Sequence, residues 1–223
     1  MILTDTSPAL IAPPGVYRPQ ADTLLLADAL SHERLGPDRE VLEIGTGTGA
    51  VALRAAATGA RVTAVDVSWQ AVLAARLNGF VQRRPLRVLH GDFAARTRGR
   101  RFDLVLANPP YVPSPDTRLP TRGPQRAWDA GPDGRRVIDR ICDTAPELLR
   151  PGGVLLMVHS AMCGAQTTVE HLARLGLSAR VTARTSVPWG PVLRSRARWL
   201  RERGLVEDGD EREELVVIRA RHL

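Results

Sequence analysis

The tetrapeptide Asn108-Pro109-Pro110-Tyr111 has the residue types needed to hold a planar NH2 group. Proline lacks a backbone N–H, so two in a row make a stiff segment that offers only carbonyl oxygens. The Asn108 side-chain oxygen and the Pro109 carbonyl could accept both hydrogens of an amide or ring amine, and Tyr111 could stack on its face. The simpler alternative is an Asn-Pro turn that opens a loop.

The nitrogen of such a group is a weak nucleophile because its lone pair is delocalised. Acceptors on both of its N–H groups favour a pyramidal nitrogen, which stabilises the transition state for attack. Positioning against an electrophilic methyl group supplies much of the remaining acceleration, so no strong general base is needed. The tetrapeptide therefore indicates transfer of a methyl group to nitrogen.

A glycine-rich segment, EIGTGTGA (43–50), joins a predicted strand to a predicted helix. Glycines at 45, 47 and 49 permit a tight turn and let a ligand approach the backbone closely. Their spacing is not that of the dinucleotide fingerprint, and the Lys-Ser/Thr pair of a phosphate-binding loop is missing. By itself the segment also fits a plain strand-to-helix turn.

Three acidic residues, Glu43, Asp66 and Asp92, stand at the carboxyl ends of predicted strands, where open α/β sheets bind ligands. Asp66 is placed to accept hydrogen bonds from ribose hydroxyls, and Glu43 could bind a positively charged group. Three carboxylates would repel a pyrophosphate. They suit a ligand with hydroxyls, an exocyclic amine and a cationic amino acid end, and S-adenosylmethionine has all three.

Alternating strands and helices predict an open α/β sheet with helices on both faces. The expected strands cover 41–45, 61–66, 86–92, part of 102–111, 153–160, 178–187 and 213–221. The expected helices cover 22–32, 49–59, 68–80, 134–149, 164–174 and 192–203. Residues 112–133 have no periodicity, and loops of that length in compact domains are usually functional.

Composition favours one globular domain, because 43% of the 223 residues are hydrophobic and 25% are charged. We expect no signal peptide, no membrane helix and no disulfide framework, and hence a cytoplasmic protein. The formal net charge is +7, and all 31 basic residues are arginine. This bias fits a nucleic-acid or acidic protein partner, or a compositional preference of the coding sequence.

Together the motifs resemble class I S-adenosylmethionine-dependent methyltransferases, and more narrowly the HemK-like protein glutamine N5-methyltransferases. VYRPQADTLLL (16–26) resembles the entry segment of the short subfamily known from archaea and eukaryotes, and EIGTGTG, AVDVS, GDF and NPPYVP follow in family order. AWDAGPDGRRVIDRI (127–141), LLRPGG (148–153) and the C-terminal EELVVIRA extend the likeness over nearly the whole chain.

The resemblance implies a Rossmann-like fold: a seven-stranded, mostly parallel sheet with an antiparallel last strand. We expect one domain, in which an entry segment (1–40) packs on a methyltransferase domain (41–223). The implied cofactor contacts are Thr23, Glu43, Gly45, Gly47, Asp66, Asp92, Phe93 and Asn108. Asn108 and Pro109 would hold the target nitrogen with Tyr111 beside it, no metal would take part, and S-adenosylhomocysteine would be the product.

The usual substrate in this family is the glutamine of the Gly-Gly-Gln motif in peptide chain release factors. Longer bacterial members carry an N-terminal helical docking domain, which we expect to be absent here. Eukaryotic short members work with a small zinc-binding activator. The same chemistry on a nucleic-acid amine or a small metabolite is the alternative function, and a non-catalytic cofactor-binding module is a third.

Other chemically active residues are interpreted as structural. We expect His90 and His159 to be strand residues, and Cys142 and Cys163 to be buried small hydrophobes. Trp128 either lines the substrate pocket or packs. The arginines of the predicted helix 192–203 favour a solvated face over a nucleic-acid track.

Overall fold

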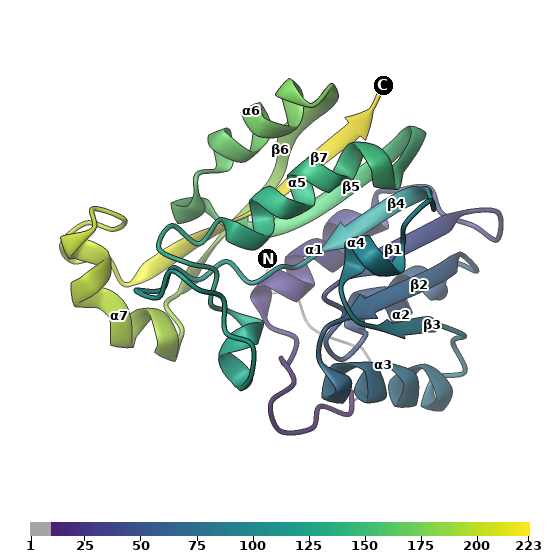
Figure 1. The fold of residues 1–223 in the computed structure, drawn as a ribbon, viewed down its shortest axis with the longest axis horizontal. Coiled ribbons are helices and arrows are strands. Elements are labelled where there is room, and N and C mark those ends of the chain that lie inside the picture. Colours follow the sequence, from purple (N-terminus) through teal and green to yellow (C-terminus); the bar gives the residue numbers. More distant parts are fainter. Residues whose placement is uncertain (1–9) are drawn as a thin grey trace.

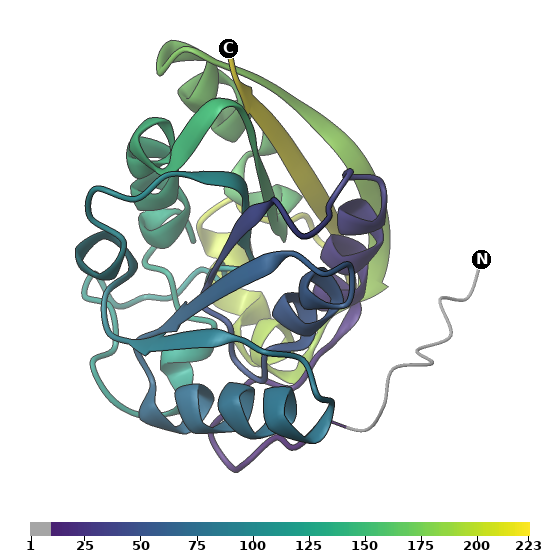
Figure 2. The same cartoon turned by 90° about the vertical axis from the view of Figure 1, so that its right-hand side faces the viewer.

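In the computed structural model, which describes residues 10–223, the chain forms a twisted sheet covered by helices (Figures 1 and 2). The expected entry segment (1–40) falls partly on residues 1–9, outside the described residues. Within those residues the sheet has seven strands in the order β3-β2-β1-β4-β5-β7-β6. They are β1 (Glu40–Ile44), β2 (Arg61–Asp66), β3 (Arg87–His90), β4 (Phe102–Ala107), β5 (Leu149–Ser160), β6 (Leu177–Pro188) and β7 (Arg212–His222).

The strand directions confirm the predicted sheet. β1 pairs in parallel with β2 and with β4, and the parallel arrangement continues to β3 and β5 at either side. β7 runs antiparallel to both β5 and β6. The carboxyl ends of the other strands and the amino end of β7 therefore lie at one edge of the sheet.

Helices cover both faces of the sheet because its strands are apolar on both sides. Along β4, Leu104 and Leu106 belong to one core and Val105 to the other. One face packs against α1 (Ala21–Ser31), α2 (Ala50–Ala56) and α3 (Trp69–Val81). The other packs against α4 (Phe93–Arg96), α5 (Arg136–Leu148) and α6 (Ala165–Arg174).

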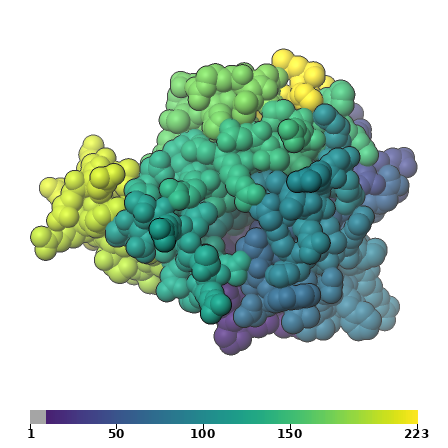
Figure 3. All heavy atoms as spheres, in the orientation of Figure 1, coloured from purple at the N-terminus to yellow at the C-terminus, as the bar shows by residue number. Residues whose placement is uncertain are grey.

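The last helix, α7 (Pro191–Glu202), lies beyond the carboxyl edge of the sheet and does not cover a face. It packs through its own small apolar cluster of Trp189, Leu193 and Leu200. In Figure 3 the yellow-green segment that contains α7 projects from the left side of the molecule. No helix within residues 10–223 combines the length and the apolar character needed to cross a bilayer.

Local signals account for most element boundaries. Ser68, where the predicted helix 68–80 begins, caps α3, its hydroxyl accepting a hydrogen bond from the Ala71 N–H. α4 was not predicted, because its four residues are too few to show helical periodicity. β5 begins at Leu149, four residues before the predicted start at 153, because Leu149 pairs with Phe102 across a register shift.

The long loop after β4 is ordered by contacts that its sequence does not reveal. Val112 and Asp129 form an isolated bridge, and residues 124–127 form a short 3-10 helix. Arg196 of α7 binds the Asp129 carboxylate at 2.6 Å and the Pro113 carbonyl at 2.9 Å. The predicted solvated arginine face of this helix is therefore wrong for Arg196, which anchors the loop to α7.

A substitution at Gly134 tests how tightly this loop packs against the tetrapeptide 108–111. The φ of Gly134 is +70°, and a Cβ there would collide with the Tyr111 carbonyl and lie 2.8 Å from Cys163 Sγ. We expect Gly134→Ala to lower the free energy of unfolding by about 2–5 kcal/mol, the sum of backbone strain and overpacking. Urea unfolding measures the change.

The matched control is Gly176→Ala. Gly176 has a similar φ of +84° with nothing within 4 Å of the added Cβ. Only the backbone strain applies there, about 1–2 kcal/mol. Equal losses in the two variants would contradict close packing at Gly134.

Candidate functional site

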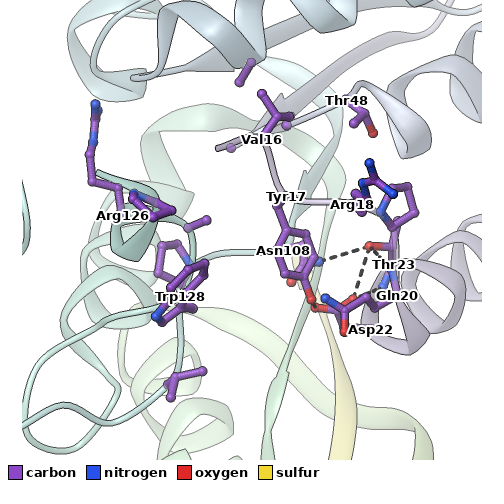
Figure 4. A pocket seen from close by; sticks show the side chains of 18 of the residues that line it. Val16, Tyr17, Arg18, Gln20, Asp22, Thr23, Thr48, Asn108, Arg126 and Trp128 are labelled. Carbon is purple, nitrogen blue, oxygen red and sulfur yellow. Dashed lines mark hydrogen bonds between the residues drawn. The ribbon is translucent and has the colours of Figure 1, made fainter. Parts of the chain in front are cut away.

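A cavity of about 1390 Å³ opens at the carboxyl edge of the sheet. Its wall combines seven stretches of chain that are distant in sequence. They are the entry segment before and within α1 (12–23), the glycine loop, the end of β2 with the start of α3, the tetrapeptide after β4, the loop at 122–128, the segment at 187–194 and the start of β7 (213–215). Figure 4 shows one part of this wall, with Asn108, Tyr17 and Thr23 facing Arg126 and Trp128 across the cavity.

A short chain of hydrogen bonds fixes the orientation of the Asn108 side chain. Asn108 Nδ2 donates to Thr23 Oγ1 over a long 3.5 Å, and the Thr23 hydroxyl donates to Asp22 Oδ1 at 3.1 Å (Figure 4). The ionised carboxylate only accepts, so the single Thr23 proton is used there and its oxygen must accept from Asn108. The amide oxygen of Asn108 is then left as an acceptor on the cavity wall.

Tyr111 is held by the same carboxylate. Its hydroxyl donates to Asp22 Oδ2 at 3.3 Å, and the Tyr17 hydroxyl donates to that oxygen at 2.8 Å. Burial, together with the nearby Asp22 carboxylate, raises the pKa of both phenols well above the usual value, so both remain neutral donors. The Tyr111 ring also packs against both hydrophobic cores. The surrounding fold therefore fixes the position of Tyr111.

Glu43 contacts the glycine loop. Its Oε2 accepts hydrogen bonds from the Thr46 hydroxyl and from the Ala52 N–H, the latter at 3.2 Å. Burial raises the pKa of Glu43 to about 8, although these two hydrogen bonds act in the opposite direction. Glu43 thus ties the loop to the start of α2.

Asp66 closes the other side of the glycine loop. Its Oδ2 accepts from the Gly47 N–H at 2.9 Å and its Oδ1 from the Ser68 N–H at 2.8 Å. Burial raises the pKa of Asp66, while those bonds and the positive charge of Arg126 lower it in part. Each carboxylate oxygen has a further lone pair, so Asp66 can still accept from a ligand in the cavity.

Most of the predicted site residues meet at this cavity, and two do not. Thr23, Glu43, Gly45, Gly47, Asp66, Asn108, Pro109 and Tyr111 all line it. Asp92 instead accepts from the Ala95 N–H at 3.1 Å, capping α4, and forms an ion pair with Arg140 at 2.6 Å. Phe93 is buried, with the same guanidinium 5.0 Å from its ring centroid. The cofactor contacts expected of these two residues stay predictions.

Sequence reasoning did not single out several residues of the wall. Tyr17 and Asp22 lie inside the entry motif, but nothing local shows that Asp22 binds two phenols. Arg126, Trp189 and Glu213 also line the cavity, and no pattern in the sequence marks them. Within residues 10–223 no group of three or more His, Cys, Asp and Glu side chains is placed to hold a metal ion.

Comparison with known proteins gives one family model and clear relatives. The model described as "Methyltransferase small domain" matches residues 9–121. A Methanocaldococcus jannaschii protein named "Putative protein N5-glutamine methyltransferase MJ0928" is 33% identical over 79% of this chain and 88% of its own length. The release factor glutamine methyltransferase of Moorella thermoacetica is 39% identical over 65% of this chain, which spans only 54% of that enzyme.

Solved structures show the same fold. Mtq2 of E. cuniculi, solved in the Mtq2-Trm112 complex responsible for methylation of the termination factor eRF1, has a TM-score of 0.64 at 21% identity, covering 94% of this chain and 99% of its own. The T. thermophilus 16S rRNA N2 G1207 methyltransferase, solved with AdoMet and guanosine, has a TM-score of 0.60 at 24% identity, covering 92% of this chain and 44% of its own.

These structural likenesses are evidence for the fold alone, whereas the family model and the M. jannaschii relative reach further. The chain belongs to the methyltransferase small domain family and, within it, to the HemK-like N5-glutamine methyltransferases.

Proposed function

We propose that this methyltransferase uses S-adenosylmethionine to methylate the side-chain amide nitrogen of a protein glutamine, with the Gly-Gly-Gln motif of a release factor as its substrate. The oriented Asn108 amide carries the proposal. It places an acceptor beside a donor-free proline pair, in the cavity that Asp66 also lines. Release factors act on cytoplasmic ribosomes, so the reaction would take place there.

The residues present fit this cofactor. Gly45 and Gly47 have φ of +70° and +54°, which glycine adopts without strain. Because neither residue has a side chain, the loop leaves room for a nucleoside. Asp66 would accept from the ribose hydroxyls, and Glu43 would keep the loop in shape. When bound, S-adenosylmethionine supplies a methyl group on a positively charged sulfur. Each carboxylate oxygen of Asp92 likewise keeps a further lone pair, so its ion pair with Arg140 leaves it able to accept from the adenine amine.

The chain's own contribution to the reaction is to orient the target nitrogen. Asn108 Oδ1 and the Pro109 carbonyl would accept the two N–H groups of the glutamine amide, and Tyr111 would lie beside it. The hydrogen bonds to these acceptors become stronger as the nitrogen becomes pyramidal and positively charged, which stabilises the transition state. The proton lost from nitrogen is acidic once the methyl group is attached, so solvent can take it.

A small protein partner is part of the proposal, and α3 offers a surface for it. Trp69, Leu73 and Phe80 on this helix are 54%, 59% and 82% exposed. Such a contiguous apolar face is unusual on a monomer. Residues 67–90 contain four arginines and no acidic residue. They include β3, which is an edge strand in the described sheet. An acidic protein with an apolar face would match this surface.

The substrate is tested with isotopically labelled S-adenosylmethionine, a release factor and a variant of that factor in which Ala replaces the glutamine. We expect label on the glutamine alone. Asn108→Ala should lower kcat by about 10²–10³-fold while the cofactor Kd stays nearly unchanged, because it removes an acceptor used in the transition state. Label on RNA, or no label on the release factor, would reject the substrate.

Asp66→Ala is the contrasting variant in the same assay. It should weaken cofactor binding by about tenfold or more, as expected for loss of charge-assisted hydrogen bonds. Calorimetry with S-adenosylhomocysteine gives the Kd of each variant. A large loss of cofactor affinity in Asn108→Ala would show that its role is misassigned.

For the partner, we expect a small acidic protein to copurify in equal amount with the tagged chain from its own cells and to raise methyl transfer when added back. The double change Leu73→Asp, Phe80→Asp should abolish both effects. Leu175→Asp, an exposed leucine on α6's C-terminal side, is the control and should change neither. Full activity of the chain alone would argue against a required partner.

The buried Glu43 predicts a pH dependence of stability. Its pKa is about 8 in the fold against 4.5 for the unfolded chain, so folding takes up a proton between these values. The contribution of Glu43 to stability is therefore fully present below pH 4.5 and is lost as pH rises through 8, by on the order of 5 kcal/mol. Urea unfolding from pH 5 to 9 should show this loss, and Glu43→Gln should flatten the curve.

Glu40→Gln is the control on the same strand. Glu40 forms surface ion pairs with Arg61 and Arg100, so its removal leaves the buried group in place. The wild-type curve and the Glu40→Gln curve should keep the same slope. Parallel curves for wild type and Glu43→Gln would mean that Glu43 does not control the slope.

A further inference from the structure

Two residues that line the cavity each have a buried side-chain polar atom with no hydrogen-bond partner in the described structure. These atoms are Oε2 of Glu213 and Nε1 of Trp189, and Trp189 is only 3% exposed. Buried polar groups are nearly always paired in native proteins, so each exception calls for an explanation. Since both atoms belong to residues that line the cavity, a ligand in the cavity can supply the missing partners.

The two residues are neighbours at the edge of the sheet. In the β6–β7 ladder, Val187 is paired with Glu213, and the Trp189 N–H extends the ladder by donating to the Glu211 carbonyl at 2.8 Å. Trp189 and Glu213 are therefore diagonal cross-strand neighbours, within reach of one small ligand group. β6 and β7 stand on the opposite side of β4 from β2, which carries Asp66 (Figure 1). The pair therefore lies across β4 from Asp66 and the glycine loop.

The chemistry of the pair is one donor and one acceptor. The indole N–H can only donate, and an ionised carboxylate oxygen can only accept. A peptide unit offers one N–H and one C=O, so it satisfies both. Burial and the like charge of Asp22 raise the pKa of Glu213 to about 7, although a hydrogen bond from Ser160 lowers it. A cation would relieve that repulsion more than the neutral N–H of an amide would. An amide, however, pairs with both the Glu213 acceptor and the Trp189 donor.

The neighbouring Asp22 does not turn this region into a site for an amine. Its carboxylate already accepts four hydrogen bonds, from the Thr23 N–H and hydroxyl and from the two tyrosines. Only the single Glu213 oxygen remains unpaired beside it. One free acceptor next to one free donor favours a main-chain segment over an ammonium group, which needs three acceptors.

We propose that Glu213 and Trp189 bind the main chain of the protein substrate next to the methylated side chain. Glu213 Oε2 accepts a backbone N–H, and Trp189 Nε1 donates to a backbone carbonyl. The inference rests on the proposed function and explains why glycines precede the glutamine. A glycine has no side chain to keep its backbone away from the wall, so its peptide groups can reach both atoms.

The test compares conservative variants by steady-state kinetics with the release factor. Glu213→Gln should raise KM for that substrate about tenfold, and Trp189→Phe about three- to fivefold, with kcat and the cofactor Kd unchanged. Glu214→Gln is the control for the first, since Glu214 is exposed and bound to Arg184 at 2.5 Å. Trp199→Phe is the control for the second, since Trp199 packs in the same apolar cluster away from the cavity wall.

A modified substrate tests the main-chain contact directly. In a Gly-Gly-Gln peptide, an ester oxygen replaces the N–H of one glycine at a time. For one position KM should rise about tenfold with the wild-type enzyme, and Glu213→Gln should add no further loss, because the two changes remove the same bond. KM values equal to those of the controls, or a fall in kcat at constant KM, would overturn the inference.

The two proposals fail in distinguishable ways. If the wild-type enzyme puts no methyl group on the release-factor glutamine, the proposed function is wrong. If it does so and the Glu213 and Trp189 variants keep the wild-type KM, only the main-chain contact is wrong.

Discussion

The orientation of one amide group is the constraint on which the site depends. Asp22 is an acceptor, so the hydroxyl of Thr23 must give it a proton, and the oxygen of Thr23 must then accept from Asn108. Turning the Asn108 amide over would place two oxygen atoms face to face with no proton between them. Such an arrangement is repulsive, so the amide oxygen is directed at the ligand before any ligand arrives.

The sheet brings this amide to the glycine loop. β1 and β4 pair in parallel with Ile44 opposite Ala107, so the next residue of each strand, Gly45 and Asn108, emerges at the same level. A Cβ on Gly45 would lie 3.8 Å from the Asn108 carbonyl oxygen. Since the strand order reverses direction between these two strands, the crevice lies at the switch point where open α/β sheets bind ligands. One backbone register therefore places the tetrapeptide that starts at Asn108 beside the glycine loop.

Local sequence was enough to predict features that depend on a single segment of the chain. The apolar runs of β1 and β4, the glycines after β1 and the two prolines after β4 each carry their own signal, so the strands and the carboxylates at their ends could be predicted. Side-chain partners across the fold could not be. Tyr111 and Asp22 are 89 residues apart, and Arg196 and Asp129 are 67 apart. These pairs follow from how α1 and α7 pack, and no local pattern encodes that packing.

Asp92 is a second case in which a contact with a distant segment could not be predicted from local sequence. Its position at the end of the predicted strand 86–92 is the feature that suggested a ligand contact, whereas β3 ends two residues earlier, at His90. The competing partner comes from α5, whose Arg140 both pairs with the Asp92 carboxylate and covers the Phe93 ring. A strand end therefore predicts where a carboxylate lies, but the neighbouring helix decides what it binds.

The distribution of charge supports a ligand that carries positive charge. Glu43, Asp66 and Glu213 line the cavity, and hydrogen bonds from backbone N–H groups and hydroxyls hold them. Burial raises the pKa of all three carboxyl groups, although hydrogen bonds from the protein act in the opposite direction. By contrast, Asp103 at the opposite end of the sheet is paired with two arginines, and its pKa is lowered. In a chain of formal net charge +7, the buried acids Glu43 and Asp66 thus lie beside the glycine loop, where the proposed cofactor would bind, and a positive ligand there would favour their ionised forms.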